Sequence, residues 1–177
     1  MTREELAKQI YKVAHITGEF TLRSGIVSNE YFDKYQFEAR PQLLINIAEQ
    51  LGAKLPIETE LLAGLEVGGI PIATAISLAK NLPMVFVRKE AKKYGTAKLV
   101  EGIDIANKKL LVVEDVITSG GQVISSTKDL RNLGAEITKA VCVIDREQGG
   151  REALAEVGVE LISLFTMSEM KKLAGIS

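Results

Sequence analysis

Cysteine, histidine and excess charge are nearly absent from this chain of 177 residues. The single cysteine, Cys142, has no partner for an internal disulfide, and its apolar neighbours predict a buried structural thiol. The single histidine, His15, stands at the end of an expected helix with no nucleophile signature nearby, which argues against a Ser-His-Asp or Cys-His catalytic site. The net charge of −1 argues against general nucleic-acid binding, so any anion site must come from local basic clusters.

Long apolar runs and low-complexity tracts are also missing. No stretch of about 18 apolar residues occurs, so a membrane span is not indicated. The segment Met1 to Glu5 begins an amphipathic helix that Thr2 can cap, and it lacks the apolar core of a signal peptide. We therefore expect a cytoplasmic protein. With 46% hydrophobic and 25% charged residues, a single domain over 1–177 is expected.

The chain does contain a series of short apolar segments, each separated from the next by a turn and a helical pattern. The expected strands cover 60–65, 83–87, 110–115, 138–144 and 160–164. The expected helices cover 2–13, 41–51, a segment ending at 80, 122–133, 151–157 and a short segment from 168. Because buried strands alternate with helices, the pattern predicts an α/β fold with a parallel sheet covered on both faces.

The most informative stretch is 110–121, a buried strand that ends in two acids and continues into a turn of hydroxyl-bearing residues and glycines. A strand–turn–helix unit of this kind directs free backbone N–H groups and the positive end of a helix dipole at one point, which suits a phosphate. Thr118 and Ser119 add hydroxyl donors, and the glycines that follow let the backbone approach a ligand closely.

Two acids, Glu114 and Asp115, distinguish this turn from a simple phosphate-binding loop. The turn has neither the Gly-Lys-Ser/Thr of a Walker A loop nor the GxGxxG dinucleotide fingerprint. Carboxylates beside a phosphate suit a ligand that also carries sugar hydroxyls or a bound Mg²⁺, and a phosphorylated ribose has both features. The alternative is an ordinary strand-to-helix turn with two solvated acids.

The segment Val112 to Gly120 resembles the phosphoribosyl pyrophosphate (PRPP) motif of type I phosphoribosyltransferases, and further segments between about Gly18 and Met170 resemble orotate phosphoribosyltransferases. The resemblance implies a central, mostly parallel five-stranded sheet with helices on both faces, and a small hood to which residues 1–40 contribute most. It also implies transfer of the phosphoribosyl group of PRPP to orotate. The products would be orotidine 5′-monophosphate and pyrophosphate, in de novo pyrimidine (UMP) biosynthesis.

The same resemblance assigns roles to the residues of the motif. Glu114 and Asp115 are expected to be catalytic, holding ribose hydroxyls and favouring positive charge on the sugar. The cofactor Mg²⁺ would be held mainly by PRPP, with no protein ligand assigned. The residues expected to bind PRPP are Arg23, Arg88, Lys89, Lys92, Glu114, Asp115, Val116, Ile117, Thr118, Ser119, Gly120, Gly121 and Gln122.

A basic segment follows the strand at 83–87, with four cations within residues 88–93. A solvated charged loop is the ordinary explanation of such a run. Here, however, the cations lie at a strand end, where ligands of open α/β sheets gather, and a closing basic loop could cover a pyrophosphate leaving group. By resemblance, residues 88–102 form the catalytic loop, with Lys92 catalytic. This loop would reach the neighbouring subunit's site in a homodimer.

A hairpin is expected over 18–33 because apolar and polar residues alternate around a Ser-Gly turn. The structural explanation is an edge hairpin that packs two aromatic residues into a core. By resemblance it is the hood that closes over the base, and Tyr31 and Phe32 would lie against the orotate ring. Arg23 stands where the family usually has lysine, which keeps the charge but not the geometry.

Arg146 follows the expected strand at 138–144 and matches the arginine with which the family holds orotate. A guanidinium pairs well with a planar carboxylate, although a local ion pair with Asp145 is the structural alternative. Thr118 completes the residues expected to bind orotate. The family's histidine position in the basic loop is occupied here by Tyr94.

A second strand–glycine turn–helix unit covers residues 66–71, and its backbone N–H groups could also meet an anion. In the family, the matching loop lies against the pyrophosphate. Two other functions stay open at this point. One is a phosphoribosyltransferase for a purine or for uracil, against which the hood segment and Arg146 argue. The other is a non-catalytic PRPP-sensing module, against which the cation cluster argues.

Overall fold

The computed structural model describes residues 1–21, 25, 27–90 and 98–176. The predicted roles of Arg23 and Lys92 therefore lie outside the described residues. The elements are α1 (Arg3–Ala14), β1 (His15–Thr21), β2 (Val27–Phe32), α2 (Tyr35–Glu38), α3 (Pro41–Gly52), β3 (Leu61–Leu65), α4 (Gly69–Lys80), β4 (Met84–Val87), β5 (Val100–Glu101), β6 (Lys109–Ile117), α5 (Gly121–Asn132), β7 (Glu136–Asp145), α6 (Gly150–Glu156), β8 (Glu160–Thr166) and α7 (Met167–Ala174).

The main sheet has the strand order β5-β4-β3-β6-β7-β8. The five strands from β4 to β8 in this order are parallel, and the two-residue β5 pairs antiparallel with β4 at the edge. The prediction of a mostly parallel α/β sheet is thus confirmed, with a short edge strand added to the five expected strands. From β3 the chain proceeds to one side of the sheet, and from β6 to the other. The strand order therefore reverses between β3 and β6.

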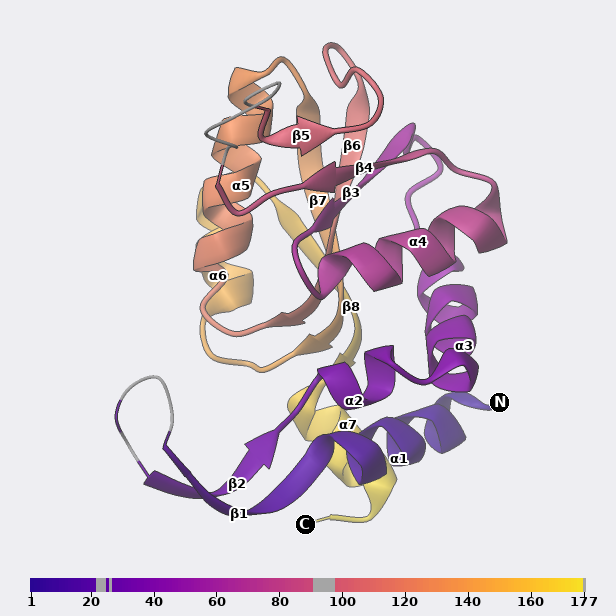
Figure 1. Cartoon of the computed structure of the whole chain (residues 1–177), viewed down its shortest axis with the longest axis vertical. Helices are drawn as coiled ribbons and strands as arrows, with labels where there is room; N and C mark the ends of the chain where they lie inside the picture. The colour runs from indigo at the N-terminus through magenta and orange to yellow at the C-terminus, as the bar shows by residue number, and fades with distance from the viewer. Residues whose placement is uncertain (22–24, 26, 91–97, 177) are drawn as a thin grey trace.

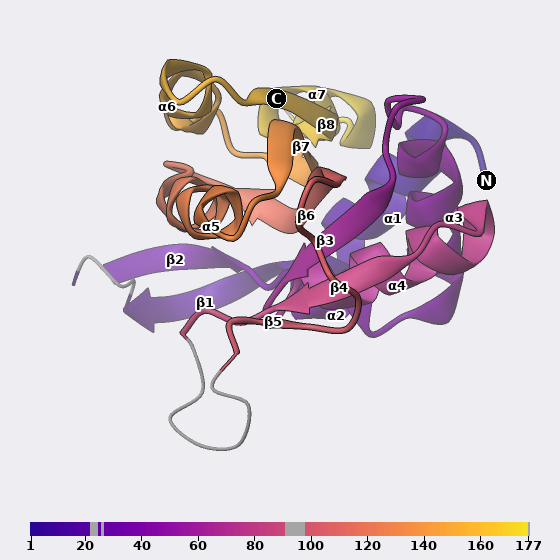
Figure 2. The ribbon, with the colours of Figure 1, turned by 90° about the horizontal axis from the view of Figure 1, so that it is seen from above.

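Helices cover both faces of this sheet, as Figures 1 and 2 show. One apolar cluster joins α3 and α4 to residues such as Leu62, Leu111 and Val141. The other joins α5 and α6 to residues from the opposite face, including Val112 and Cys142. Neighbouring residues along a strand point to opposite faces, which explains why strands buried on both sides are continuously apolar. Cys142 is a free, fully buried thiol, as predicted.

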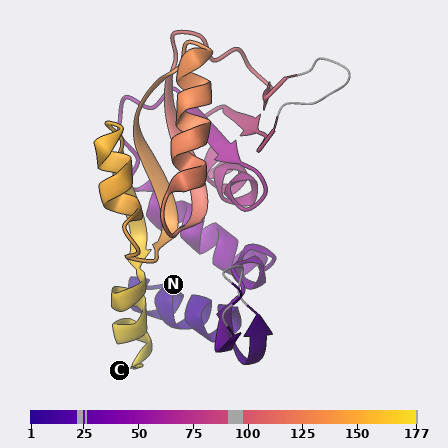
Figure 3. The ribbon, with the colours of Figure 1, turned by 90° about the vertical axis from the view of Figure 1, so that its left-hand side faces the viewer.

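The hood consists of α1, the antiparallel hairpin β1–β2, α2 and the C-terminal helix α7. It lies at the end of the sheet where β6, β7 and β8 terminate (Figures 1 and 3). The predicted cap of α1 is present, since Thr2 Oγ1 accepts from Glu5 N at 3.2 Å and Glu5 Oε2 accepts from Thr2 N at 2.8 Å. The guanidinium of Arg3 joins α1 to α7 through the carboxylate of Glu169, at 2.8 Å.

The apolar cluster that includes α3 and α4 also contains residues of α1 and α7, so the hood shares its core with one face of the sheet. Packing of this kind fixes the hood hairpin above the carboxyl ends of the strands. In the part of the chain that the structure describes, no helix is long and apolar enough to cross a membrane.

Candidate functional site

The reversal of strand order between β3 and β6 marks the expected place for a ligand in this fold. In open α/β sheets, helices leave adjacent strands on opposite faces at such a point, and a crevice opens at the carboxyl ends of the strands. Two turns meet here: the turn from β3 into α4, and the turn from β6 into α5. The hood hairpin faces the same end of the sheet (Figure 1).

A cavity of about 370 Å³, here called the turn cavity, lies at the β6–α5 turn. Gly120 precedes α5 in a left-handed conformation, with φ of +77°, and no side chain caps the helix. The first N–H groups of α5 therefore need partners from outside the helix, and they favour an anion. The cavity is lined by Lys89, Glu114, Val116, Ile117, Thr118, Ser119, Gly120, Gly121, Gln122, Val123 and Ser125.

Most of the predicted PRPP-binding residues thus border one cavity, with two described exceptions. Arg88 instead approaches the carboxylate of Glu101 on β5, with Nε and Oε1 3.4 Å apart. Asp115 borders neither this cavity nor the neighbouring one described below. The structure brings the residues of the motif together, and their roles in PRPP binding stay predictions.

A second cavity, of about 440 Å³ and here called the hood cavity, lies between the hood and the ends of β6 and β7. The residues predicted to hold the base, Tyr31, Phe32, Thr118 and Arg146, all border it. Thr118 borders the turn cavity as well. The two cavities therefore meet at one residue, which is the arrangement that two substrates reacting with each other would need.

Arg146 is available to a ligand because Asp145 is occupied by other groups. Asp145 Oδ2 accepts from Arg151 Nε at 3.1 Å, and its Oδ1 accepts from Glu147 N at 2.9 Å. The local ion pair between Asp145 and Arg146, considered from the sequence, is thus replaced by a pair with Arg151. Arg146 Nε is buried and has no hydrogen-bond partner in the described structure. A buried donor of this kind indicates an acceptor supplied from outside.

Seven residues of the hood cavity were not predicted, and four of them can carry charge or stack: Tyr11, His15, Glu30 and Lys171. His15 Nε2 lies 2.8 Å from Glu30 Oε2, and the ring of Tyr11 stacks on His15 at 4.9 Å. The hydrogen bond from His15, aided by the charges of Lys171 and Arg146, lowers the pKa of Glu30. Lys171 comes from the last turn of α7, where a lysine ordinarily interacts with the helix dipole. No local sequence pattern therefore predicted its place at the hood cavity.

The two acids of the motif occupy different environments. Glu114 is 8% exposed, borders the turn cavity, and accepts from Asp115 N through Oε1 at 3.0 Å. Burial, followed by the nearby charge of Asp115, raises the pKa of Glu114. Asp115 is fully buried, and its Oδ2 lies 2.6 Å from Lys34 Nζ. Whether Asp115 holds a ribose hydroxyl therefore stays a prediction, and in this structure its carboxylate pairs with the hood.

The β3–α4 turn packs against these acids. A Cβ atom on Gly68 would lie 1.5 Å from Asp115 Oδ2, and one on Gly69 would lie 2.2 Å from the carbonyl oxygen of Val113. Glu66 Oε1, on the same turn, accepts from Lys89 N at 2.5 Å. This turn thus joins the buried acid pair to the start of the basic segment.

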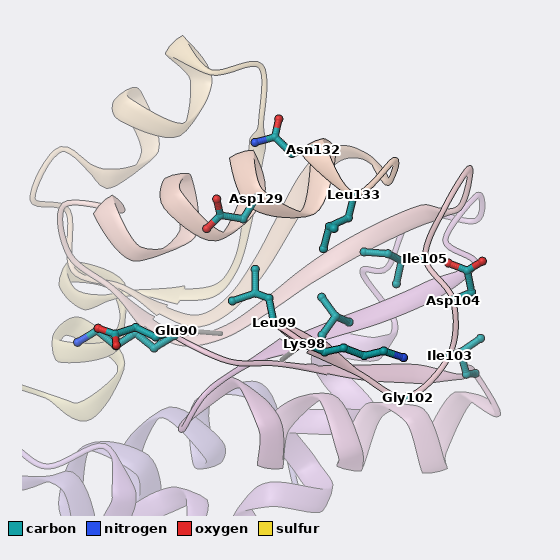
Figure 4. A pocket seen from close by; sticks show the side chains of 12 residues that line it. Glu90, Lys98, Leu99, Gly102, Ile103, Asp104, Ile105, Asp129, Asn132 and Leu133 are labelled. Carbon is teal, nitrogen blue, oxygen red and sulfur yellow. The ribbon is translucent and has the colours of Figure 1, made fainter. Parts of the chain in front are cut away.

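A third cavity, of about 850 Å³, is bordered by Lys89, by residues between 98 and 105 and by the end of α5 (Figure 4). Figure 4 shows Asp129 and Asn132 of α5 on one side of it and Ile103 and Ile105 on the other. Apart from Lys89, none of the predicted site residues borders it. Its position at the far end of α5 separates it from the motif.

Comparison with known proteins gives one family and many relatives. Residues 35–166 match the family model of the phosphoribosyl transferase domain. The chain is similar to the orotate phosphoribosyltransferase of a Nocardioides species, with 50% identity over 93% of this chain and 92% of the relative. It is also similar to the orotate phosphoribosyltransferase of Pyrococcus abyssi, with 41% identity over 99% of this chain and 98% of the relative.

Solved structures give the same relationship. The orotate phosphoribosyltransferase of Aeropyrum pernix superposes with a TM-score of 0.80 at 30% identity, covering 96% of this chain and 98% of that chain. The Mycobacterium tuberculosis enzyme, in its complex with PRPP, superposes with a TM-score of 0.79 at 26% identity, covering 95% and 98%.

Proposed function

The chain belongs to the orotate phosphoribosyltransferase family, and we propose that it transfers the phosphoribosyl group of PRPP to orotate. The products are orotidine 5′-monophosphate and pyrophosphate, in pyrimidine biosynthesis. The observation that carries this proposal is the meeting of two cavities at Thr118, one at the uncapped start of α5 and one bordered by aromatic and cationic side chains. The predicted cytoplasmic location is part of the same proposal.

The reaction needs position and charge, and no protein nucleophile. A ring nitrogen of orotate forms a bond to the anomeric carbon while the bond from that carbon to the pyrophosphate oxygen breaks. The pyrophosphate leaves with the electron pair, so the ribose carries positive charge in the transition state. The proton that the ring nitrogen loses passes to the departing pyrophosphate. Holding the two reactants in adjacent cavities supplies the orientation, and fixed charges supply the stabilisation.

The turn cavity suits the phosphorylated ribose. The free N–H groups of α5, with the hydroxyls of Thr118 and Ser119, bind the 5′-phosphate. Glu114 stands on the wall of the same cavity, where its carboxylate can accept hydrogen bonds from ribose hydroxyls. The ionised form of Glu114 is favoured in the transition state, because the positive charge that develops on the ribose attracts a carboxylate.

The hood cavity suits a flat anionic base. Tyr31 and Phe32 provide aromatic surface, and the guanidinium of Arg146 provides a fork that matches the orotate carboxylate. Lys171 adds a second cation to the same cavity. Uracil and the purines lack this carboxylate, so orotate gains most from the two cations.

Mg²⁺ is part of the proposal as an ion carried by PRPP. Among residues 1–21, 25, 27–90 and 98–176, no three His, Cys, Asp or Glu side chains are arranged to hold a metal. Glu114 borders the turn cavity, and its carboxylate could face the ion there. The ion offsets negative charge on the departing pyrophosphate. Lys89 borders the turn cavity and contributes a cation to the same end, as Lys92 is predicted to do.

A homodimer completes the proposal, with the 88–102 loop reaching the neighbouring site. An apolar groove of about 660 Å³ between α3 and α4 supports it, because Leu78 on its rim is 81% exposed and Ile45 is half exposed. Leu78→Glu should turn the dimer into a monomer in sedimentation experiments. A wild-type chain that sediments as a monomer at all concentrations would contradict this part.

The function is tested by mixing the protein with PRPP, Mg²⁺ and one base at a time. We expect orotidine 5′-monophosphate and pyrophosphate with orotate, and no nucleotide with uracil, adenine, guanine or hypoxanthine. Product from another base with none from orotate would replace this function with that of a different phosphoribosyltransferase. PRPP binding with no product from any base would indicate a sensing module.

A further inference from the structure

Lys34 joins the hood to the acid pair of the PRPP motif. It follows directly after β2, the strand that carries Tyr31 and Phe32 into the hood cavity. Its Nζ lies 2.6 Å from Asp115 Oδ2 on β6, while it borders neither the hood cavity nor the turn cavity. The ion pair therefore joins β2, which borders the hood cavity, to β6, which borders the turn cavity.

The backbone around Lys34 is held in place by its own neighbours. Asp33 N donates to the carbonyl of Ala14 at 2.8 Å, and the carboxylate of Asp33 accepts from Tyr35 N at 3.2 Å and from Gln36 Nε2 at 3.0 Å. These bonds fix the point from which the Lys34 side chain extends. Lys34 is also about one-third exposed, so a change there is tolerated better than at a fully buried position.

Lys34 is the single cation in a group of three buried carboxyls within the described residues. Asp115 is fully buried, Glu38 on α2 is 7% exposed, and Glu114 lies beside them on β6. Glu38 Oε1 lies within 3.0 Å of the position a Cβ on Gly68 would take, and Asp115 Oδ2 within 1.5 Å of it. Glu38 Oε1 has no hydrogen-bond partner. The β3–α4 turn contributes only Gly68 to this group, so it adds no charge.

We propose that Lys34 is a positioning residue of the reaction: through Asp115 it sets the orientation and charge of the acid pair at the PRPP cavity and ties the base-binding hood to it. This rests on the proposed function. The side chain acts on the substrates only through Asp115 and the hood backbone. Removing its charge leaves three carboxyls to share one buried site, and a proton then stays on the group to higher pH.

The experiment compares Lys34→Met with wild type, Lys34→Arg and Asp115→Asn, alone and combined. We expect Lys34→Met to lower kcat/KM for PRPP by about tenfold or more, in the range typical of coupled sites. The acidic limb of its pH profile should move upward by about one pH unit, because an adjacent cation lowers a carboxyl pKa by at least that much. Lys34→Arg keeps the charge and should restore most of the activity.

In the Asp115→Asn background, Lys34→Met should change kcat/KM by less than about twofold, since its target carboxylate is gone. Lys8→Met is the matched control, because Lys8 pairs with Glu4 on the exposed face of α1. An unchanged kcat/KM and pH limb in Lys34→Met would overturn the proposal. So would an equal loss in both backgrounds, or a lower melting temperature with an unshifted limb.

Failure of the proposed function looks different. In that case wild type itself makes no orotidine 5′-monophosphate. Calorimetric titration with PRPP and Mg²⁺ can then still measure how PRPP binding weakens at low pH. The same pH dependence in wild type and Lys34→Met would reject the role of Lys34 independently of the proposed function.

Discussion

Two turns of this chain look alike in sequence and differ in what they face. Each leads from a buried strand through glycines into a helix: Glu66 to Gly69 precedes α4, and Thr118 to Gly121 precedes α5. A Cβ on Gly121 would meet only Ser119 Oγ, at 3.9 Å, and the turn borders a cavity. Cβ atoms on Gly68 and Gly69 would collide with Asp115 and with the Val113 backbone.

The difference shows that glycine can serve two purposes at a strand end. In the β6–α5 turn, its missing side chain leaves room for a ligand next to free N–H groups. In the β3–α4 turn, it lets one strand end pack directly against another. A glycine-rich turn therefore becomes a candidate phosphate site only when its N–H groups face open space, which neighbouring strands decide.

The largest effect is expected when one glycine of each turn is changed to alanine, because the added methyl group should destabilise the β3–α4 turn and weaken ligand binding at the β6–α5 turn. Gly69→Ala forces a Cβ into the Val113 carbonyl and should cost about 3 kcal/mol, the upper end for overpacking. A domain of this size should then lose roughly 6–12 °C in melting temperature. Gly121→Ala should shift melting by no more than about 2 °C and instead raise the KM for PRPP. Equal melting shifts in the two variants would remove the distinction.

The second largest effect is expected from Asp115, the buried acid against which the β3–α4 turn packs. Asp115→Asn should lower turnover by more than about tenfold while the protein still folds, because the carboxylate charge is lost and the shape is kept. Steady-state kinetics at saturating PRPP and orotate measure it. Near-normal turnover would refute a catalytic role for Asp115, whether direct or through Glu114.

The third prediction concerns Arg146, which borders the hood cavity next to the β6–α5 turn. Arg146→Ala should raise the KM for orotate by about tenfold, the loss of a charge-assisted pair, with a much smaller change in the KM for PRPP. Kinetics with each substrate varied in turn give both constants. An unchanged orotate KM would remove Arg146 from the base site.

The last prediction concerns the pH dependence of stability and Glu38, the buried acid of α2 that lies near Gly68 of the β3–α4 turn. Burial, followed by the neighbouring carboxyl of Asp115, raises the pKa of Glu38 from 4.5 to about 9. The folded protein thus keeps a proton that the unfolded chain releases, so this group's contribution to stability falls as pH rises from about 4.5 to about 9. Gln has no proton to lose. The melting temperature of Glu38→Gln relative to wild type should therefore increase across that window, and a constant difference would contradict the burial of this proton.

Much of the fold and of the site could be predicted from local patterns. Continuous apolar runs gave the parallel strands, because sheets covered on both faces need them. The small hydroxyl-bearing turn after β6 predicted a phosphate site, and a cavity lies there. The family resemblance, and not a local pattern, placed Tyr31, Phe32 and Arg146 at one site with Thr118, and these residues border one cavity. The strands and the turn each depend on a few consecutive residues, so the sequence alone predicts them.

The different positions of Glu114 and Asp115 were missed, although a signal existed. Consecutive side chains of a strand point to opposite faces, so two adjacent acids are expected to meet different surroundings. Lys34, Glu38 and Lys171 could not be found in this way. They reach the site from the hood and from α7, and only tertiary packing brings them there.

The most direct test of the two-cavity arrangement is the crystal structure of this protein with PRPP, Mg²⁺ and orotate. We expect the 5′-phosphate against the first turn of α5, the ribose hydroxyls facing Glu114, and the orotate carboxylate at Arg146, with Thr118 between the two ligands. Density for PRPP at the β3–α4 turn alone, or for orotate outside the hood cavity, would contradict it.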